Sequence, residues 1–223
     1  MPGSIIYRGS SVLTGEPIVS VATDGSRNPK TGDMLQVWIM PAANPHLSAR
    51  TGCDTSVCGA CPRRPSATRD GLAPCYVTTY QAPLAVWRAF ERGRYPEVDP
   101  AEVGAGRLVR LGAYGDPAAV PTSVWERLLS RAAGWTGYTH AWRYPGVSGE
   151  LARWTMASCD SEDDARIAQR SGWRTFRAGP GPVGRERVCP ASAEAGHKIT
   201  CEACLYCGGI DGRGTGNVTI REH

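Results

Sequence analysis

The chain has 223 residues, enough to bury a hydrophobic core of ordinary size, and we expect one domain over 1–223 that needs no disulfides to fold. Its formal charge is +4, from 25 basic and 21 acidic residues, an excess too mild to indicate a nucleic-acid-binding protein on its own. No apolar run approaches membrane-spanning length and no secretory leader is recognised, so we expect a cytoplasmic protein with no membrane partner.

Short apolar runs alternate with helical patterns through the middle of the chain. In chain order they predict a strand over 35–40, a helix over 83–90, a strand over 107–111, a helix over 121–132, strands over 137–142 and 153–158, a helix over 161–169 and a strand over 173–176. Thr122 or Ser123 is expected to open the second helix. Ser161 is expected to cap the third, and three acidic residues follow it where the helix dipole favours negative charge.

The alternation of strands and helices predicts the fold class. Parallel neighbours need crossover connections, so we expect an α/β fold in which βα repeats form a mainly parallel curved sheet or a partial TIM-like barrel with cysteine-rich metal-binding loops. Ligands bind such folds at the carboxyl ends of the strands. The polar residues expected there are Tyr114, Asp116, Thr139, His140, Ser158 and Asp160. Each also has a structural explanation, as a turn residue, a hydrogen-bonded core histidine or a local cap.

The first cysteine-rich loop spans 53–75 and contains four of the nine cysteines. Cys53, Cys58 and Cys61 have the C-x4-C-x2-C opening of plant ferredoxins, although Cys75 follows sooner than the fourth ligand of that family. If Cys53 is set aside, Cys58, Cys61 and Cys75 form a three-thiolate set. Such a set can hold a 4Fe-4S cluster and leave one iron open to water, substrate or another side chain, so chemistry is expected there.

The second cysteine-rich loop spans 189–207 and carries Cys189, Cys201, Cys204 and Cys207. Three cysteines at successive x2 spacings with a more distant fourth favour an iron-sulfur cluster, because zinc sites usually take one C-x2-C pair from each of two loops. Metal ligands near the carboxyl end of a fold often stabilise it, so this site is expected to be structural. An odd number of cysteines, eight of the nine in two groups, in a reducing compartment also argues for metal over disulfides.

Zinc is the alternative metal at both loops. The segment 204–207, followed by two glycines, looks like a zinc knuckle, and His197 could complete a mixed site. The pairs Cys58/Cys61 and Cys204/Cys207 could instead close one structural zinc site, with the other cysteines buried as small apolar side chains. Cys159, outside both loops, is expected to serve packing.

Six further stretches occur in order along the chain. They are CGACP at 58–62, CYV at 75–77, APLAVWRA at 82–89, RLGAYGDP at 110–117, TGYTH at 136–140 and CPASxEAG at 189–196. Taken together they resemble the "gene product 88" proteins of actinobacteriophages. The resemblance implies a phage protein that acts in the cytoplasm of the infected bacterial host. It also implies that Cys58, Cys61, Cys75 and the four cysteines of the second loop bind metal, whereas Cys53 is an extra cysteine.

A cluster-binding loop that follows a strand and precedes βα repeats is also loosely similar to radical S-adenosylmethionine enzymes. That similarity implies an open iron that chelates the cofactor and a cavity lined by Tyr114, Asp116 and His140. The chain differs from those enzymes in its C-x4-C-x2-C spacing, where they have C-x3-C-x2-C, and in lacking a Gly-Gly-Glu motif after the next strand.

The sequence therefore predicts a phage iron-sulfur protein with one or two 4Fe-4S clusters and redox or radical-type chemistry at the open iron. Its partner would be an unidentified small molecule or a host or phage protein. The alternative is a zinc-stabilised binding module for nucleic acid or a host protein. No hydrolytic constellation, P-loop or dinucleotide fingerprint competes with these interpretations.

Overall fold

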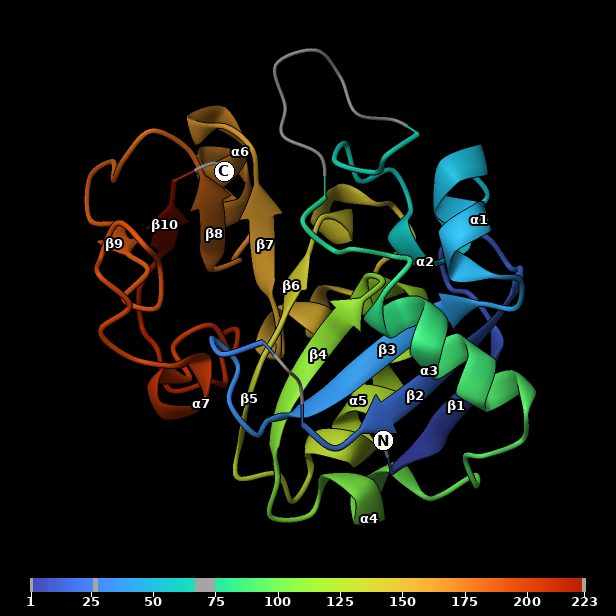
Figure 1. The fold of residues 1–223 in the computed structure, drawn as a ribbon. Helices are drawn as coiled ribbons and strands as arrows, with labels where there is room; N and C mark the ends of the chain where they lie inside the picture. Colours follow the sequence, from blue (N-terminus) through green and yellow to red (C-terminus); the bar gives the residue numbers. More distant parts are fainter. Residues whose placement is uncertain (1, 26–27, 67–74, 222–223) are drawn as a thin grey trace.

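The computed structural model describes residues 2–25, 28–66 and 75–221. Its strands form two sheets in a mixed α/β fold (Figure 1). The first sheet has the order β1-β2-β3-β4-β5, with strands at Gly3–Ser10, Pro17–Thr23, Leu35–Pro41, Leu108–Tyr114 and Gly134–Thr136. The pairings of β1 with β2 and of β2 with β3 are antiparallel, whereas β3, β4 and β5 pair in parallel.

The second sheet has the order β6-β7-β8-β10-β9, and the pairings described in it are parallel. In that order its strands lie at Tyr138–Thr139, Met156–Cys159, Thr175–Ala178, Val218–Ile220 and Arg187–Val188. The predicted α/β class with mainly parallel pairing is therefore confirmed. The strands of the described ranges form two open sheets and close no barrel.

A single stretch of chain links the two sheets. β5 lies at the edge of the first sheet and β6 at the edge of the second, and only Gly137 separates them. A Cβ atom at Gly137 would lie 2.9 Å from Cγ2 of Thr155, so the backbone passes too close to its neighbour for a larger residue. The Gly137 N–H donates to the carbonyl of Cys207 at 3.0 Å, which attaches the second cysteine loop to the junction between the sheets.

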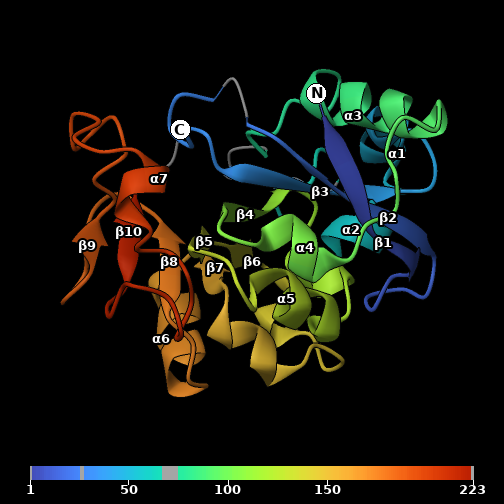
Figure 2. The ribbon, with the colours of Figure 1, turned by 90° about the horizontal axis from the view of Figure 1, so that it is seen from below.

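Helices lie on both sides of the first sheet. The α-helices span Pro45–Thr51 (α1), Thr55–Cys58 (α2), Ala82–Glu91 (α3), Pro100–Gly104 (α4), Thr122–Leu129 (α5), Glu162–Arg170 (α6) and Cys201–Cys204 (α7). Short 3-10 helices occupy Pro117–Ala119, Ala141–Arg143 and Gly149–Arg153. Figures 1 and 2 show α1 and α3 on one side of the first sheet and α5 on the other, while α6 packs on β7 and β8. Within the described ranges, no helix has the length and apolar character needed to cross a bilayer.

The main core includes residues of β4 and α5. Val109 and Leu111 of β4 and Trp125 of α5 are fully buried. The Trp125 indole N–H donates to the carbonyl of Pro117 at 2.9 Å, so its polar group is satisfied inside the core. A second, much smaller core consists of Met156, Cys207 and Val218.

Three predicted elements are confirmed closely. The strand expected over 35–40 is β3, the helix over 83–90 is α3 and the helix over 161–169 is α6. Ser161 caps α6 as predicted, because its hydroxyl oxygen accepts from the Asp164 N–H at 3.1 Å.

The strands around the sheet junction are shifted from their predicted positions. The strand expected over 137–142 is reduced to β6, because a 3-10 helix begins at Ala141. The strand over 107–111 is β4, which starts one residue later and continues further than predicted. Those over 153–158 and 173–176 are β7 and β8, and each begins a few residues later than expected.

Helix α5 is shorter than the predicted helix over 121–132. Pro121 occupies the position before its first turn and makes no side-chain capping hydrogen bond. The predicted cap at Thr122 or Ser123 is therefore wrong, because Pro121, with its fixed φ angle, already directs the chain into the helix.

Candidate metal centres

The first cysteine loop follows β3 and contains a tight turn. Helix α2 ends at Cys58. Gly59 has a φ of 54°, a left-handed value that glycine adopts without steric cost, and the turn brings the Cys61 N–H to the Cys58 carbonyl at 3.1 Å. The Cys75 N–H donates to the carbonyl of Arg63 at 2.8 Å, which brings the end of the loop back to the segment just after Cys61.

A buried ion pair fixes this loop. Nε of Arg64 donates to Oδ1 of Asp54 at 2.8 Å, and the two side chains are 10% and 2% exposed. The same guanidinium donates to the carbonyls of Gly59 at 3.0 Å and Gly52 at 2.8 Å. Burial raises the pKa of Asp54, although Arg64 acts to lower it. Arg64 therefore joins the end of α1, the start of α2 and the turn between the first two thiols.

Replacing Arg64 with methionine is expected to lower the free energy of unfolding by about 3 kcal/mol, because the Asp54 carboxylate is left buried without its charged partner. Urea denaturation followed by circular dichroism measures the change. The control is Arg153→Met, which removes an exposed ion pair with Asp211 and is expected to cost under about 1 kcal/mol. Equal losses in the two variants would show that the Arg64 pair does not hold the loop.

The structure brings Cys58, Cys61 and Cys75 together at the wall of a cavity. Burial raises the pKa of the Cys58 thiol well above its usual range, and the Asp54 carboxylate and the thiols of Cys61 and Cys75 raise it further. The Val77 N–H donates a hydrogen bond to Sγ of Cys75. Hydrogen bonds of this kind orient and tune thiolates that bind metal.

The hydrogen bonding of the Tyr114 hydroxyl bears on whether a cluster fits beside these thiols. It is buried at the end of β4 and has no hydrogen-bond partner in the part of the chain that the structure describes. Burial raises the pKa of this phenol, and Cys58 and Cys75 act in the same direction, so it remains a neutral donor. A buried donor without an acceptor costs about 1–3 kcal/mol. A sulfur atom of a cluster bound here would be the missing acceptor, so the residues present fit the group.

His140 joins the first cysteine group to a charged network. Its Nδ1 lies 3.4 Å from Sγ of Cys61, and its Nε2 lies 3.4 Å from Oδ2 of Asp160. Asp160 also accepts from Nε of Arg63 at 2.6 Å. Burial acts to lower the pKa of His140, but its hydrogen bonds to Asp160 and Cys61 outweigh burial and the pKa rises to about 10. The imidazolium therefore places positive charge beside Cys61.

Asp116 holds the turn that follows β4. Its Oδ1 accepts from the Ala118 N–H at 2.9 Å, and its Oδ2 accepts from the His140 N–H at 2.8 Å. Its own N–H donates to the carbonyl of Val57 at 2.6 Å, which ties the turn to the first cysteine loop. Burial raises the pKa of Asp116. Asp116 borders the cavity, and its hydrogen bonds match the alternative of a turn residue and also position His140.

The second cysteine loop has a tight turn of its own. Helix α7 carries Cys201 and Cys204. Leu205 has a φ of 50°, a left-handed value, so the chain reverses directly after Cys204 and continues to Cys207. The Cys201 N–H donates to the carbonyl of Lys30 at 2.6 Å, which ties the loop to the segment before β3.

The four cysteines of the second loop lie close together. Burial raises the pKa of Cys207 to about 12, against a hydrogen bond from the Tyr138 hydroxyl that acts to lower it, and the other three cysteines of the loop raise it further. The Ala191 N–H donates to Sγ of Cys189, as Val77 does to Cys75 in the first loop. Each cysteine group therefore has a backbone donor directed at one of its sulfur atoms.

Arg174 fixes the glycine-rich segment that follows the second loop. Its guanidinium donates to the carbonyls of Tyr206 at 2.9 Å, Gly209 at 2.7 Å and Gly216 at 2.6 Å. The segment has no helix or strand up to β10, and its backbone is held from inside by this one side chain.

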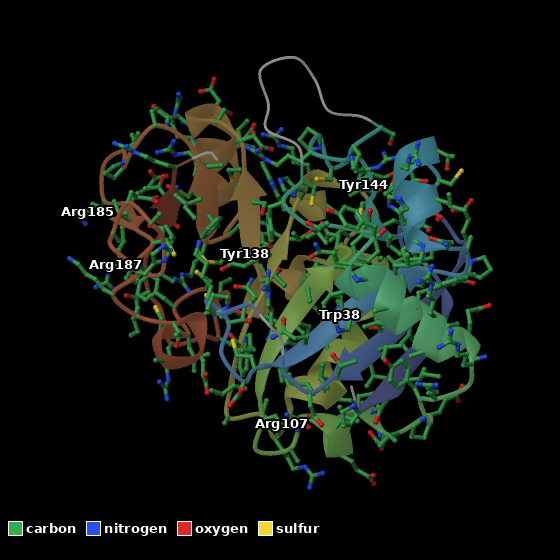
Figure 3. All side chains as sticks on the ribbon, in the orientation of Figure 1. Trp38, Arg107, Tyr138, Tyr144, Arg185 and Arg187 are labelled. Carbon is green, nitrogen blue, oxygen red and sulfur yellow. The ribbon has the colours of Figure 1, made fainter. Side chains whose placement is uncertain are left out.

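A cavity of about 450 Å³ lies between the two cysteine groups. It is lined by Cys58, Cys61 and Cys75 of the first group and by Cys189 and Cys201 of the second. Figure 1 shows the first loop, near α2, and the second loop, around α7, on opposite sides of β4 to β6, and Figure 3 shows Tyr138 between them. The two predicted metal sites therefore face one shared space.

The predicted site residues fall into two classes in the structure. Those that border the cavity, besides these five cysteines, are Tyr114, Asp116, His140, Ser158 and Asp160. Cys204 and Cys207 belong to the second group but are set back from the cavity. Cys53 is exposed and lies outside the lining, whereas Cys159 is buried at the cavity wall. All nine cysteines are free, and in the described ranges no three His, Cys, Asp or Glu side chains are gathered as a single-ion site.

Arg110 and Tyr138 border the cavity but were not among the predicted site residues. Arg110 lies near Tyr138 and Cys201. The available signal was a basic residue between Val109 and Leu111, inside an otherwise apolar strand pattern. Tyr138 gave no comparable signal, because its contact with the distant Cys207 forms only in the folded chain.

Comparison of the chain with protein-family models, with curated proteins and with solved structures finds no match. The function is therefore inferred from the two cysteine groups and the cavity between them.

Proposed function

We propose that this chain is an iron-sulfur protein in which Cys58, Cys61 and Cys75 hold a 4Fe-4S cluster with one iron open to the cavity. The four cysteines of the second loop hold a second cluster. The observation that carries this proposal is the gathering of free, partly or fully buried thiols into two groups around one cavity. On this proposal the chain belongs with the actinobacteriophage "gene product 88" proteins that its motifs resemble, and it acts in the cytoplasm of the infected host.

The first site has the surroundings that an open cluster requires. When bound, such a cluster supplies one-electron redox chemistry and a metal position that can bind a ligand. The His140 ring lies 3.4 Å from Sγ of Cys61, where its positive charge would balance a metal-bound thiolate, and the Tyr114 hydroxyl is free to donate to sulfur. The cavity admits a small molecule beside both groups. Tyr114, Asp116 and His140 border the space that a cofactor such as S-adenosylmethionine would occupy.

We propose that the two sheets together form a partial TIM-like barrel. Parallel pairing runs from β3 to β5 and again from β6 to β8, and Gly137 joins the two series. Helix α5 lies on one side of the first sheet and α6 packs on β7 and β8, and the cavity is lined from the strands and from the loops that follow their carboxyl ends. This arrangement supports the barrel interpretation, because ligand sites of such folds lie at that end.

The metal content of protein purified without oxygen tests the proposal. We expect roughly eight irons per chain with matching acid-labile sulfide and a brown visible spectrum, as two cubane clusters require. Zinc without sulfide would exclude the clusters. Reduction without oxygen in the presence of S-adenosylmethionine then tests the radical-type version, which predicts cleavage of the cofactor. Failure to cleave it would leave a redox or ligand-binding cluster as the function.

A zinc-stabilised binding module is the second candidate. The left-handed Leu205 inside the C-x2-C turn of 204–207 favours it, because the turn is then compact enough for a knuckle around one ion. Figure 3 shows Arg185 and Arg187 projecting from the same part of the molecule, where phosphate can reach them. This candidate predicts colourless protein with zinc, and nucleic-acid binding that falls steeply with salt. Absent or salt-independent binding would exclude nucleic acid as the partner.

A further inference from the structure

Arg110 lies in the cavity wall between the two cysteine groups. Its neighbours on β4, Val109 and Leu111, are buried in the main core, so the alternation of the strand turns Arg110 toward the cavity. Its Nη2 donates to the hydroxyl of Tyr76 at 2.8 Å. Within the described part of the chain Arg110 has no carboxylate partner.

The carboxylates that border the cavity are already engaged. They are Asp54 and Asp160, which form ion pairs with Arg64 and Arg63, and Asp116, which accepts from two backbone N–H groups. Lys30 also borders the cavity and, like Arg110, forms no ion pair with a carboxylate among the described residues. Both lie near Cys201. Two partly buried positive charges without a carboxylate partner give this part of the wall a positive potential, so it favours an anion.

The remaining walls of the cavity are largely apolar. They include Tyr76, Val77, Tyr138, Phe176 and Ile220. The rings of Tyr138 and Phe176 pack with their centroids 4.7 Å apart and form a continuous aromatic surface. A volume of about 450 Å³ lies in the range of sites that bind small molecules.

We propose that the cavity binds an anionic small molecule whose carboxylate or phosphate group is held by Arg110 and whose apolar body lies against Tyr138 and Phe176. The planar guanidinium can donate two parallel hydrogen bonds to either group, and Lys30 adds a second positive charge near it. This assignment names the ligand class of the site proposed above and rests on that function for its chemistry. The contact between Arg110 and the anion needs no metal.

The alternative role for Arg110 is that of a counter-charge to the thiolates of the second cysteine group. It lies near Cys201, which fits that use. Its hydrogen bond, however, runs to Tyr76, which directly follows Cys75 of the first group. Arg110 thus stands between the two groups, where a ligand that both reach would lie. Iron content and ligand binding measured on the same samples separate the two uses.

Calorimetric titration of the protein, purified without oxygen, with 1-naphthyl phosphate and with neutral 1-naphthol tests the proposal. The two probes share an apolar body and differ in the anionic group. We expect the phosphate to bind at least about tenfold more tightly, as a charge-assisted contact gives. Arg110→Gln should abolish this preference and Arg110→Lys should keep part of it. The control Arg107→Gln, just before the same strand and paired with Asp24 at the surface, should not change it (Figure 3).

The anion site would be overturned by equal affinity for the two probes, by no binding of the phosphate, or by a preference that survives Arg110→Gln. Loss of iron from Arg110→Gln together with loss of binding would also overturn it, because Arg110 would then serve the cluster. If the unaltered protein holds zinc or no metal and still binds the phosphate through Arg110, the anion site stands and the iron-sulfur function fails.

Discussion

Replacing Cys75 with alanine is expected to remove about four of the roughly eight irons per chain, because a cubane held by three thiolates loses one of them. Conversion of the first cluster to a smaller one, with loss of fewer than four irons, would also support the assignment. The second group should keep its iron, since its loop is anchored separately, by Lys30 and by Arg174. Iron and sulfide analysis, with electron paramagnetic resonance of the reduced protein, measures the loss.

The matched control for this variant is Cys53→Ala. Cys53 lies in the same loop but is exposed and outside the cavity lining, so its removal should leave the iron content unchanged. Full iron content in Cys75→Ala would refute the assignment of the first site. An equal loss in both variants would show that Cys53 is a fourth ligand and that the cluster has no open iron.

Replacing Cys204 with alanine is expected to remove the second cluster and to open the chain around β9 and β10. The core in this part of the molecule is small, with Met156, Cys207 and Val218 as its buried members. On the proposed function, a cluster bound here contributes much of the local stability, as metal does in small metal-stabilised domains. We expect a loss of at least about 3 kcal/mol in the opening free energy of this region, measured by amide hydrogen exchange over 187–220.

Cys204 is the cleaner choice for this test because it is only half-buried, whereas Cys207 is itself a core residue. The control is Cys159→Ala, which removes a buried thiol outside both groups and is expected to cost about 1 kcal/mol without loss of iron. Unchanged exchange over 187–220 in Cys204→Ala would mean that the loop is held by its protein contacts alone, such as those of Arg174.

The parts of the fold that were predictable from sequence are those with strong local signals. The apolar run before Pro41 predicted β3, and Ser161 followed by three acidic residues predicted α6. The hairpin of β1 and β2 was not predicted, because it depends on pairing with β3 and its register shifts between Ile5 and Tyr7. The short strands β9 and β10 were missed for a similar reason, since neither has a partner nearby in the sequence.

The candidate site was likewise predictable only in part from the sequence. Spacing was enough to sort eight cysteines into two groups, whereas Cys53 was set apart only by the family resemblance. Spacing could not show that both groups face one cavity, because that follows from the joint at Gly137 and from loops that return from distant strands. The roles of Arg110 and Tyr138 depend on those same tertiary contacts.

The stretch of chain shared by the two sheets also sets the spacing of the two cysteine groups. Tyr138 contacts Cys207 of the second group, and His140, two residues later, contacts Cys61 of the first. Alternate residues of an extended chain lie about 7 Å apart. The distance between these two contacts is therefore set by covalent backbone, so the wall that Tyr138 and His140 share keeps one cysteine of each group at a fixed spacing along the chain.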